Sequence, residues 1–267
     1  MAAYKRVKQG KISDVIASQL EEMIAQGVLI PGERLMSERD LALEMEVSRP
    51  SLRDALQKLE GKGLIETRQG GGTFVRNFLG PSLTDPLAAL LESSPNTAQD
   101  FLELRTTLDG IAAYYAALRA TEVDRELLTL CFESMEEAHK DEDPSEEADI
   151  DADFHMAIAE ATHNVVLLHI LRSLFTLLRT GVFFSRMNLY TRPSSRDMLL
   201  KQHKAIYEAI MAGDPDKARD AAAGHLKYVK ETMQDIGHEE ARTEVSQRRL
   251  ERYRERRKLA KKSKGLS

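Results

Sequence analysis

The sequence predicts a mainly α-helical protein of two domains, an N-terminal winged helix-turn-helix and a C-terminal all-helical bundle. Two short helical segments around a tight turn, over 31–59, are typical of helix-turn-helix domains, and a glycine-rich hairpin pattern follows over 64–75. From residue 85 onward apolar residues recur at helical spacing, with no run typical of a strand. The predicted divisions are a DNA-binding domain at 1–77, a linker at 78–84, a helical domain at 85–237 and a basic tail at 238–267.

The helix-turn-helix is predicted from its capping residues. Ser37 can cap a short helix, with Asp40 in the reciprocal position three residues later. After a tight turn at 46–47, Ser48 can cap a second helix, and Pro50 is tolerated in its first turn because those amides lack intrahelical partners. This helix start presents hydroxyls, two arginines and free N–H groups together, which suits phosphate oxygens and guanine edges. The sequence therefore predicts a DNA recognition helix here.

A β-hairpin is predicted directly after the recognition helix. Residues 64–68 and 73–75 have strand character, and 69–72, Gln-Gly-Gly-Gly, connects them. Glycines accept positive φ and let a hairpin tip approach a sugar-phosphate wall closely. A triple glycine alone indicates only a turn, but after a helix-turn-helix it indicates the wing.

The composition favours an intracellular protein whose charge is unevenly distributed. A single cysteine, Cys131, fits a reducing cytoplasm, and no signal peptide or membrane-spanning apolar run is expected. Residues 78–238 carry 15 basic and 27 acidic side chains, whereas 239–267 carry 11 basic and 5 acidic ones. The acidic middle can face away from DNA, so the net charge of −5 does not argue against DNA binding. The basic tail is interpreted as a solvated, partly disordered helix, or as a nonspecific phosphate contact.

The helical domain is expected to hold a metal site. Asp151 and His155 are four residues apart and project from one helix face, while His203 and His225 fall on two later helices. One carboxylate and three imidazoles suit zinc, nickel or manganese with positions left open for another ligand. On spacing alone, however, such a pair of residues is also common in purely structural roles. The predicted helices cover 84–93, 98–119, 122–140, 146–163, 165–188, 196–212 and 214–236.

The run from Pro31 to Val75 resembles the GntR family of bacterial winged-helix repressors. It holds the Pro-Gly, Ser-Glu-Arg, Ser-Arg-x-x-x-Arg and Gly-Gly-Gly-Thr-Phe-Val elements. The resemblance implies DNA contacts at the following positions: Arg39, Ser48, Arg49, Pro50, Ser51, Arg53, Gln69 and Gly70.

The second domain resembles the FCD effector domain of the FadR subfamily. That motif is Asp-x-x-x-His followed by two later helical histidines, and here it implies the metal ligands Asp151, His155, His203 and His225. The resemblance also implies an effector contact from Arg105, with Asn164 as a second candidate. Further stretches, among them 108–119 and 163–169, are similar to regulators of pyruvate dehydrogenase genes and imply pyruvate as effector. Lactate and glycolate remain alternatives, because a metal can chelate a 2-oxo acid or a 2-hydroxy acid equally well.

These features together predict a homodimeric cytoplasmic repressor that binds a short DNA palindrome and is released by a small carboxylate. Two other classes share the same residues. A metal-dependent hydrolase would use the site to activate water, but no general base is recognisable beside the ligands and the DNA-binding domain would have no role. A metal-sensing repressor would respond to the metal itself. The protein is therefore not expected to be an enzyme.

Overall fold

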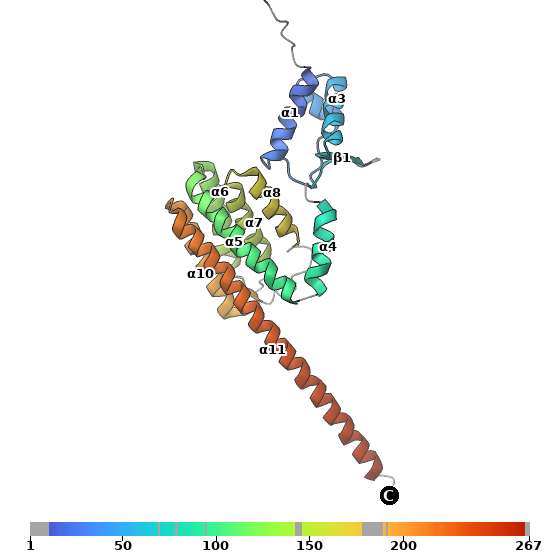
Figure 1. Cartoon of the computed structure of the whole chain (residues 1–267), viewed down its shortest axis with the longest axis vertical. Helices are drawn as coiled ribbons and strands as arrows, with labels where there is room; N and C mark the ends of the chain where they lie inside the picture. Colours follow the sequence, from blue (N-terminus) through green and yellow to red (C-terminus); the bar gives the residue numbers. More distant parts are fainter. Residues whose placement is uncertain are drawn as a thin grey trace, which may run out of the picture.

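The computed structural model describes residues 11–68, 70–77, 80–93, 95–141, 146–177, 189–190 and 192–264. The N-terminal domain has three helices followed by a two-stranded hairpin (Figure 1). In order these are α1 (Ile12–Ala25), α2 (Glu38–Glu44), α3 (Arg49–Gly61), β1 (Ile65–Arg68) and β2 (Gly72–Val75). The expected winged helix-turn-helix is therefore confirmed.

The core of this domain is formed by one face of each helix. Ile24, Leu52 and Leu59 are fully buried, and Ile65 and Val75 of the hairpin cover them from below. Burying such side chains contributes roughly 1.5–3 kcal/mol each, which holds α3 at a fixed angle to α1. The polar start of α3 is left at the surface.

The wing is a tight antiparallel hairpin in which Arg68 lies opposite Gly72. Gly72 has a φ of 102°, and a Cβ there would lie 2.8 Å from Nε of Arg34. A side chain at this position would therefore be strained and obstructed. Arg34 itself pairs with Phe74 as an isolated β-bridge. Gln69, at the tip, lies outside the described residues.

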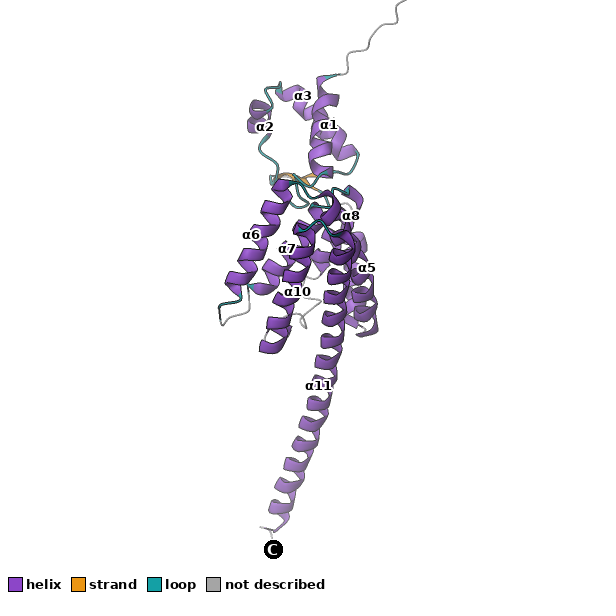
Figure 2. Cartoon of the chain, turned by 90° about the vertical axis from the view of Figure 1, so that its left-hand side faces the viewer, coloured by secondary structure: helices purple, strands orange, loops and turns teal. Residues whose placement is uncertain are grey.

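The second domain is helical throughout its described part. Its helices are α4 (Gly80–Ser93), α5 (Pro95–Arg119), α6 (Glu122–Ala138), α7 (Glu147–Glu160), α8 (Val165–Leu177), α10 (Pro193–Met211) and α11 (Pro215–Lys264). Figure 2 shows them running roughly side by side below the DNA-binding domain. Buried Phe154, Leu171, Ile206 and Ile210 join α7, α8 and α10 into one core. The predicted all-helical bundle is confirmed.

Three helices begin earlier than the sequence pattern indicates. Helix α4 starts at Gly80, inside the segment predicted as linker, α5 starts at Pro95, and α10 starts at Pro193. In each case a proline lies within the first two helical positions. Proline is favoured there, because it has no N–H to leave unpaired and its φ is already helical.

Helix α11 continues without a break through the predicted domain end at 237 and into the basic tail, for 50 residues in all. From Gly237 to Arg256 every side chain is exposed. Figures 1 and 2 show this part projecting from the end of the bundle opposite the DNA-binding domain. The tail is thus not placed beside the recognition helix of its own chain. None of the described helices combines the length and the apolar character needed to cross a membrane.

Candidate functional site

Ser37 caps α2 and Ser48 caps α3, as predicted. The reciprocal bond expected from Asp40 is not formed, because its carboxylate accepts from Oγ of Ser37 at 2.6 Å and not from the Ser37 N–H. The Asp40 N–H donates to Oγ of Ser37 at 3.2 Å, and the Ser51 N–H donates to Oγ of Ser48 at 3.3 Å. Glu46 has a φ of 51°, which turns the chain sharply between the two helices. Pro50 occupies the first turn of α3. Ser48, Arg49 and Pro50 are exposed at the start of α3, where the free N–H groups of the helix can face phosphate.

The two arginines of the recognition helix differ in their surroundings. Arg49 is exposed at the first position of α3. Arg53, one turn later, donates to the carboxylate of Glu38 on α2, with Nη2 2.7 Å from Oε2. The guanidinium of Arg53 holds the pKa of the Glu38 carboxyl below its usual range. This ion pair fixes the direction of Arg53 on the surface that α2 and α3 share.

Arg39 and Gly70, two other predicted contacts, are both exposed. The side chain of Arg39 is 84% exposed on α2. Gly70 has a φ of 72° at the exposed hairpin tip, a conformation that favours glycine. These positions are open to a partner, as a DNA contact requires.

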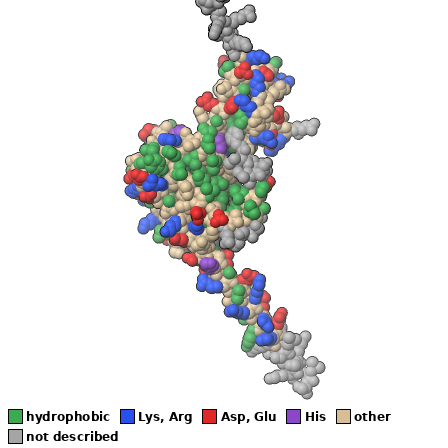
Figure 3. Space-filling model, viewed as in Figure 1, with side chains coloured by type: hydrophobic (Ala, Val, Ile, Leu, Met, Phe, Trp, Pro, Cys, Tyr) green, Lys and Arg blue, Asp and Glu red, His purple; other side chains and the backbone are tan. Residues whose placement is uncertain are grey.

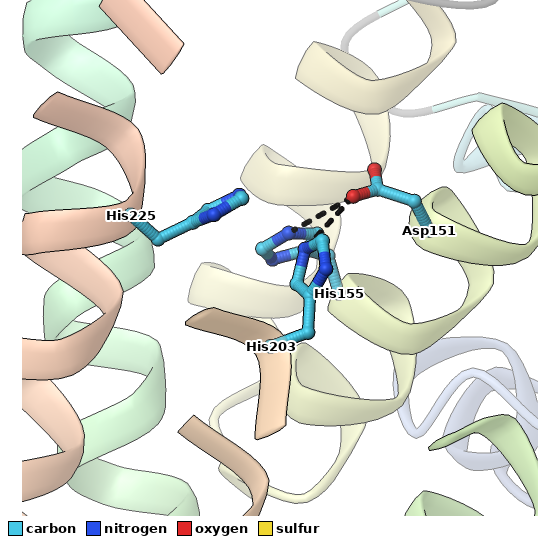
Figure 4. Close-up of side chains that lie close together, drawn as sticks. All are labelled: Asp151, His155, His203 and His225. Carbon is cyan, nitrogen blue, oxygen red and sulfur yellow. Dashed lines mark ion pairs between the residues drawn. The ribbon is translucent and has the colours of Figure 1, made fainter. Parts of the chain in front are cut away.

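The predicted metal ligands come together inside the bundle. Asp151 and His155 lie on α7, His203 on α10 and His225 on α11. Each offers a ligand atom, and these atoms all lie within 4.8 Å of one another (Figure 4). All four side chains are buried. Three separate helices thus direct one carboxylate and three imidazoles at one point.

The chemistry of this cluster fits a divalent cation. Nε2 of His203 lies 2.9 Å from Oδ1 of Asp151, and Nε2 of His155 lies 3.8 Å from the same oxygen. Burial lowers the pKa of His155 to about 3, so this imidazole is neutral, as a metal ligand must be. A carboxylate buried among imidazoles has a large desolvation cost, which a bound cation would offset. Asp151, His155, His203 and His225 would hold the ion.

Gln202 and Asp109, which the sequence did not single out, lie beside the second ring nitrogen of two of these histidines. Nδ1 of His225 lies 3.0 Å from Oε1 of Gln202, which fixes Nδ1 as the protonated nitrogen and leaves Nε2 for a metal. Asp109 places Oδ2 at 3.9 Å from Nδ1 of His155. Asp109 follows Arg105 by four residues, so the helical period could have placed it beside the candidate effector contact.

Arg105 is buried next to this cluster, with 4% of its surface exposed. Its Nη2 donates to Oδ2 of Asp109 at 2.5 Å, and its guanidinium lies 4.6 Å from the centre of the Phe175 ring. Nε of Arg105 and Oδ1 of Asp109 have no hydrogen-bond partner among the described residues. A buried arginine with an unused donor is a suitable anchor for a carboxylate.

A small cavity adjoins Arg105 and the ligands. Among the described residues, Asp151, His155, His225, Tyr190 and Met233 contribute to its lining together with Arg105. Its free volume is about 20 Å³, which admits little more than one water-sized group. A bound organic acid therefore requires the lining to move.

Asn164, the other candidate effector contact, is placed elsewhere. Its Oδ1 accepts the Leu167 N–H at 3.2 Å and so caps the start of α8. It follows His155 by nine residues and is not among the lining residues of the cavity. Its position gives it a capping role.

A winged helix-turn-helix joined to a helical domain with a buried carboxylate–imidazole cluster is the architecture of a transcription regulator that responds to a small molecule. Two family models match the chain: "Bacterial regulatory proteins, gntR family" over residues 12–75, and "FCD domain" over residues 100–228. The chain belongs to the GntR family of regulators and carries an FCD domain.

Several relatives match over most of their length. The chain is 40% identical to the "Putative L-lactate dehydrogenase operon regulatory protein" of Escherichia coli, over 87% of this chain and 90% of that protein. It is 38% identical to the Glc operon transcriptional activator of Escherichia coli, over 88% and 94% of the two chains. The HTH-type transcriptional regulator LutR of Bacillus subtilis is 33% identical, over 79% and 96%.

Proposed function

We propose that this protein senses a small 2-hydroxy carboxylate, with L-lactate as the leading candidate, and that the bound acid weakens its hold on an operator. The observation that carries this proposal is the convergence of Asp151, His155, His203 and His225 beside Arg105. Asp151, His155, His203 and His225 would hold a metal, which would offer the carboxylate and the 2-oxygen of such an acid further coordination positions. Arg105 then binds the second carboxylate oxygen.

The choice of L-lactate rests on the relatives. The relative at 40% identity is named for an L-lactate dehydrogenase operon, and the match spans 90% of that protein. Genes for L-lactate use are therefore the proposed targets. Pyruvate, implied by the similarity of 108–119 and 163–169 to regulators of pyruvate dehydrogenase genes, stays a prediction and competes for the same site. Glycolate is the third candidate acid.

Titration of the operator complex with L-lactate, glycolate and pyruvate tests this assignment. We expect L-lactate to release the metal-loaded protein at the lowest concentration. The variant Arg105→Lys keeps the charge beside Asp109 but loses the planar fork, so its affinity for the acid should fall about tenfold or more in calorimetry while it keeps its metal. Release by pyruvate alone would move the assignment to the 2-oxo acid. Release by metal alone would identify a metal sensor, and unchanged acid affinity in Arg105→Lys would remove Arg105 from the site.

We also propose that the protein acts as a homodimer on an inverted repeat, because one winged domain reads only a few base pairs. Figure 3 shows hydrophobic side chains gathered on one face of the bundle. Helices α5 and α6 expose large apolar side chains at helical spacing, which a second copy of the chain would cover. They are Leu104, Ile111 and Leu118 on α5 and Val123, Leu127 and Leu130 on α6.

The dimer proposal predicts the effect of placing charges on this face. Leu118 is 55% exposed and Leu127 is 41% exposed, so neither is needed to fill the core of a single chain. The double variant Leu118→Asp, Leu127→Asp should be monomeric at micromolar concentration by light scattering, with its helical content retained. Its operator affinity should fall at least about a hundredfold, since the two half-sites would then be bound independently. A dimer of undiminished stability would place the interface on another surface.

A further inference from the structure

Helix α8 runs from the metal cluster to the DNA-binding domain. It comprises thirteen residues, Val165–Leu177, with neither glycine nor proline. Most of its side chains are buried, which holds it as a rigid rod.

The C-terminal half of α8 contacts the site. The Phe175 ring stacks on the imidazole of His155, with ring centres 5.9 Å apart and planes at 28°. The same ring lies under the guanidinium of Arg105 at 4.6 Å. Phe175 therefore touches both a metal ligand and the proposed carboxylate anchor.

The N-terminal half of α8 contacts the DNA-binding domain directly. Nε2–H of His169 donates to the carbonyl oxygen of Ala25, the last residue of α1, at 3.2 Å. Gly27, in the turn that follows, has a φ of 77°, and a Cβ there would lie 3.0 Å from Leu168 and 3.2 Å from Arg172. The turn thus lies flat against α8.

Two further contacts join α8 to the DNA-binding domain and to α7. Oγ of Ser173 lies 3.4 Å from Oδ1 of Asn77, just beyond the wing. Arg172 also pairs with Glu160 at the end of α7, at 2.8 Å, and α7 carries two of the metal ligands. Phe175 and His169 are six residues apart, or about 9 Å along the helix. A small displacement at one end is therefore transmitted to the other.

We propose that α8 conveys occupancy of the metal and effector site to α1 through His169 and the Gly27 turn. This inference rests on the proposed function. The cavity is too small for an organic acid, so an acid that pairs with Arg105 must displace the side chains around it, and the guanidinium of Arg105 lies directly on the Phe175 ring. Phe175 then repacks, α8 shifts, and the end of α1 follows. Because α1 packs on α3, the recognition helix changes its angle to the bundle.

Hydrogen exchange on the full-length protein, with and without Zn²⁺ and L-lactate, tests this path. In the parent protein, ligand addition should change exchange at residues 24–29 as well as in the segments that carry the four ligands. In His169→Ala, exchange in the segments that carry the four metal ligands should change on ligand addition as it does in the parent protein. The change in exchange at 24–29 should be at least about fivefold smaller, and the ligand-induced loss of operator affinity should decrease with it. His169→Gln, which keeps an N–H donor, should restore much of the response.

The matched control is Thr176→Ala, which alters the exposed side of α8 and should leave the response intact. An equal response at 24–29 in the parent protein and in His169→Ala would overturn the inference. So would protection of the ligand segments with no change at 24–29 in the parent protein. If the ligand segments themselves show no protection, the proposed function fails, and the inference with it.

Discussion

Removing His203 and His225 together should abolish metal binding and every response to the effector, while binding to the operator without effector stays within about twofold. Both side chains are buried, at 0% and 3% exposure, and they come from two different helices. With only Asp151 and His155 left, the site has two ligands, too few for a stable zinc or nickel site. The metal content of His203→Ala, His225→Ala, measured by mass spectrometry after purification without chelator, should fall from one ion per chain to near zero.

The control for this variant is His163→Ala, His238→Ala, because both of these histidines are exposed and outside the cluster. It should keep one metal per chain. Buried histidine-to-alanine changes also leave cavities, so circular dichroism must show an intact fold, and the nearly isosteric Asp151→Asn offers a second test. If the His203, His225 variant retained its metal and still released the operator on adding acid, the site would lie elsewhere.

Alanine at Arg49 should weaken operator binding more than any other single change in the DNA-binding domain. An arginine that reaches a base edge or phosphate contributes about 1–3 kcal/mol, so affinity should fall from about fivefold to more than a hundredfold. Arg53→Ala should weaken binding in the same direction, and it also releases Glu38, whose carboxylate would then repel phosphate near α2. Fluorescence anisotropy over a range of salt concentrations measures both effects.

The salt series separates the two kinds of contact. Removing a phosphate contact reduces the slope of log affinity against log salt concentration by about one unit. Removing a base contact leaves that slope unchanged and relaxes the sequence preference. Lys62→Ala is the matched control, because it removes a positive charge just beyond the far end of α3, where Lys62 pairs with Glu21. It should change affinity by less than about twofold. Full affinity in both Arg49→Ala and Arg53→Ala would remove α3 from the interface.

Local signals were sufficient to predict most of the DNA-binding domain. Ser37 and Ser48 cap α2 and α3 as their spacing indicated, and the hairpin follows where the glycines place it. The convergence of the four metal ligands was also predictable, although spacing fixes only that Asp151 and His155 share a face. That His203 and His225 reach the same point depends on how α10 and α11 pack, for which the family resemblance had to supply the expectation.

Features that depend on tertiary packing could not be predicted from the sequence. A proline can either end one helix or begin the next, so the predicted helices at 98–119 and 196–212 start after Pro95 and Pro193, whereas each of these prolines is the first residue of its helix. The sequence does not single out His169, because its contact with Ala25 joins residues 144 positions apart. The ion pair of Arg53 with Glu38 likewise joins two helices, and the spacing of residues within either helix does not predict it.

The most direct test of the central claim compares operator release by L-lactate for the same protein before and after metal removal. Protein stripped with chelator and dialysed should bind the operator but no longer respond to L-lactate, and one equivalent of Zn²⁺, Ni²⁺ or Mn²⁺ should restore the response. Release of the operator by L-lactate at the same concentration from metal-free and metal-loaded protein would contradict a sensor built on Asp151, His155, His203 and His225.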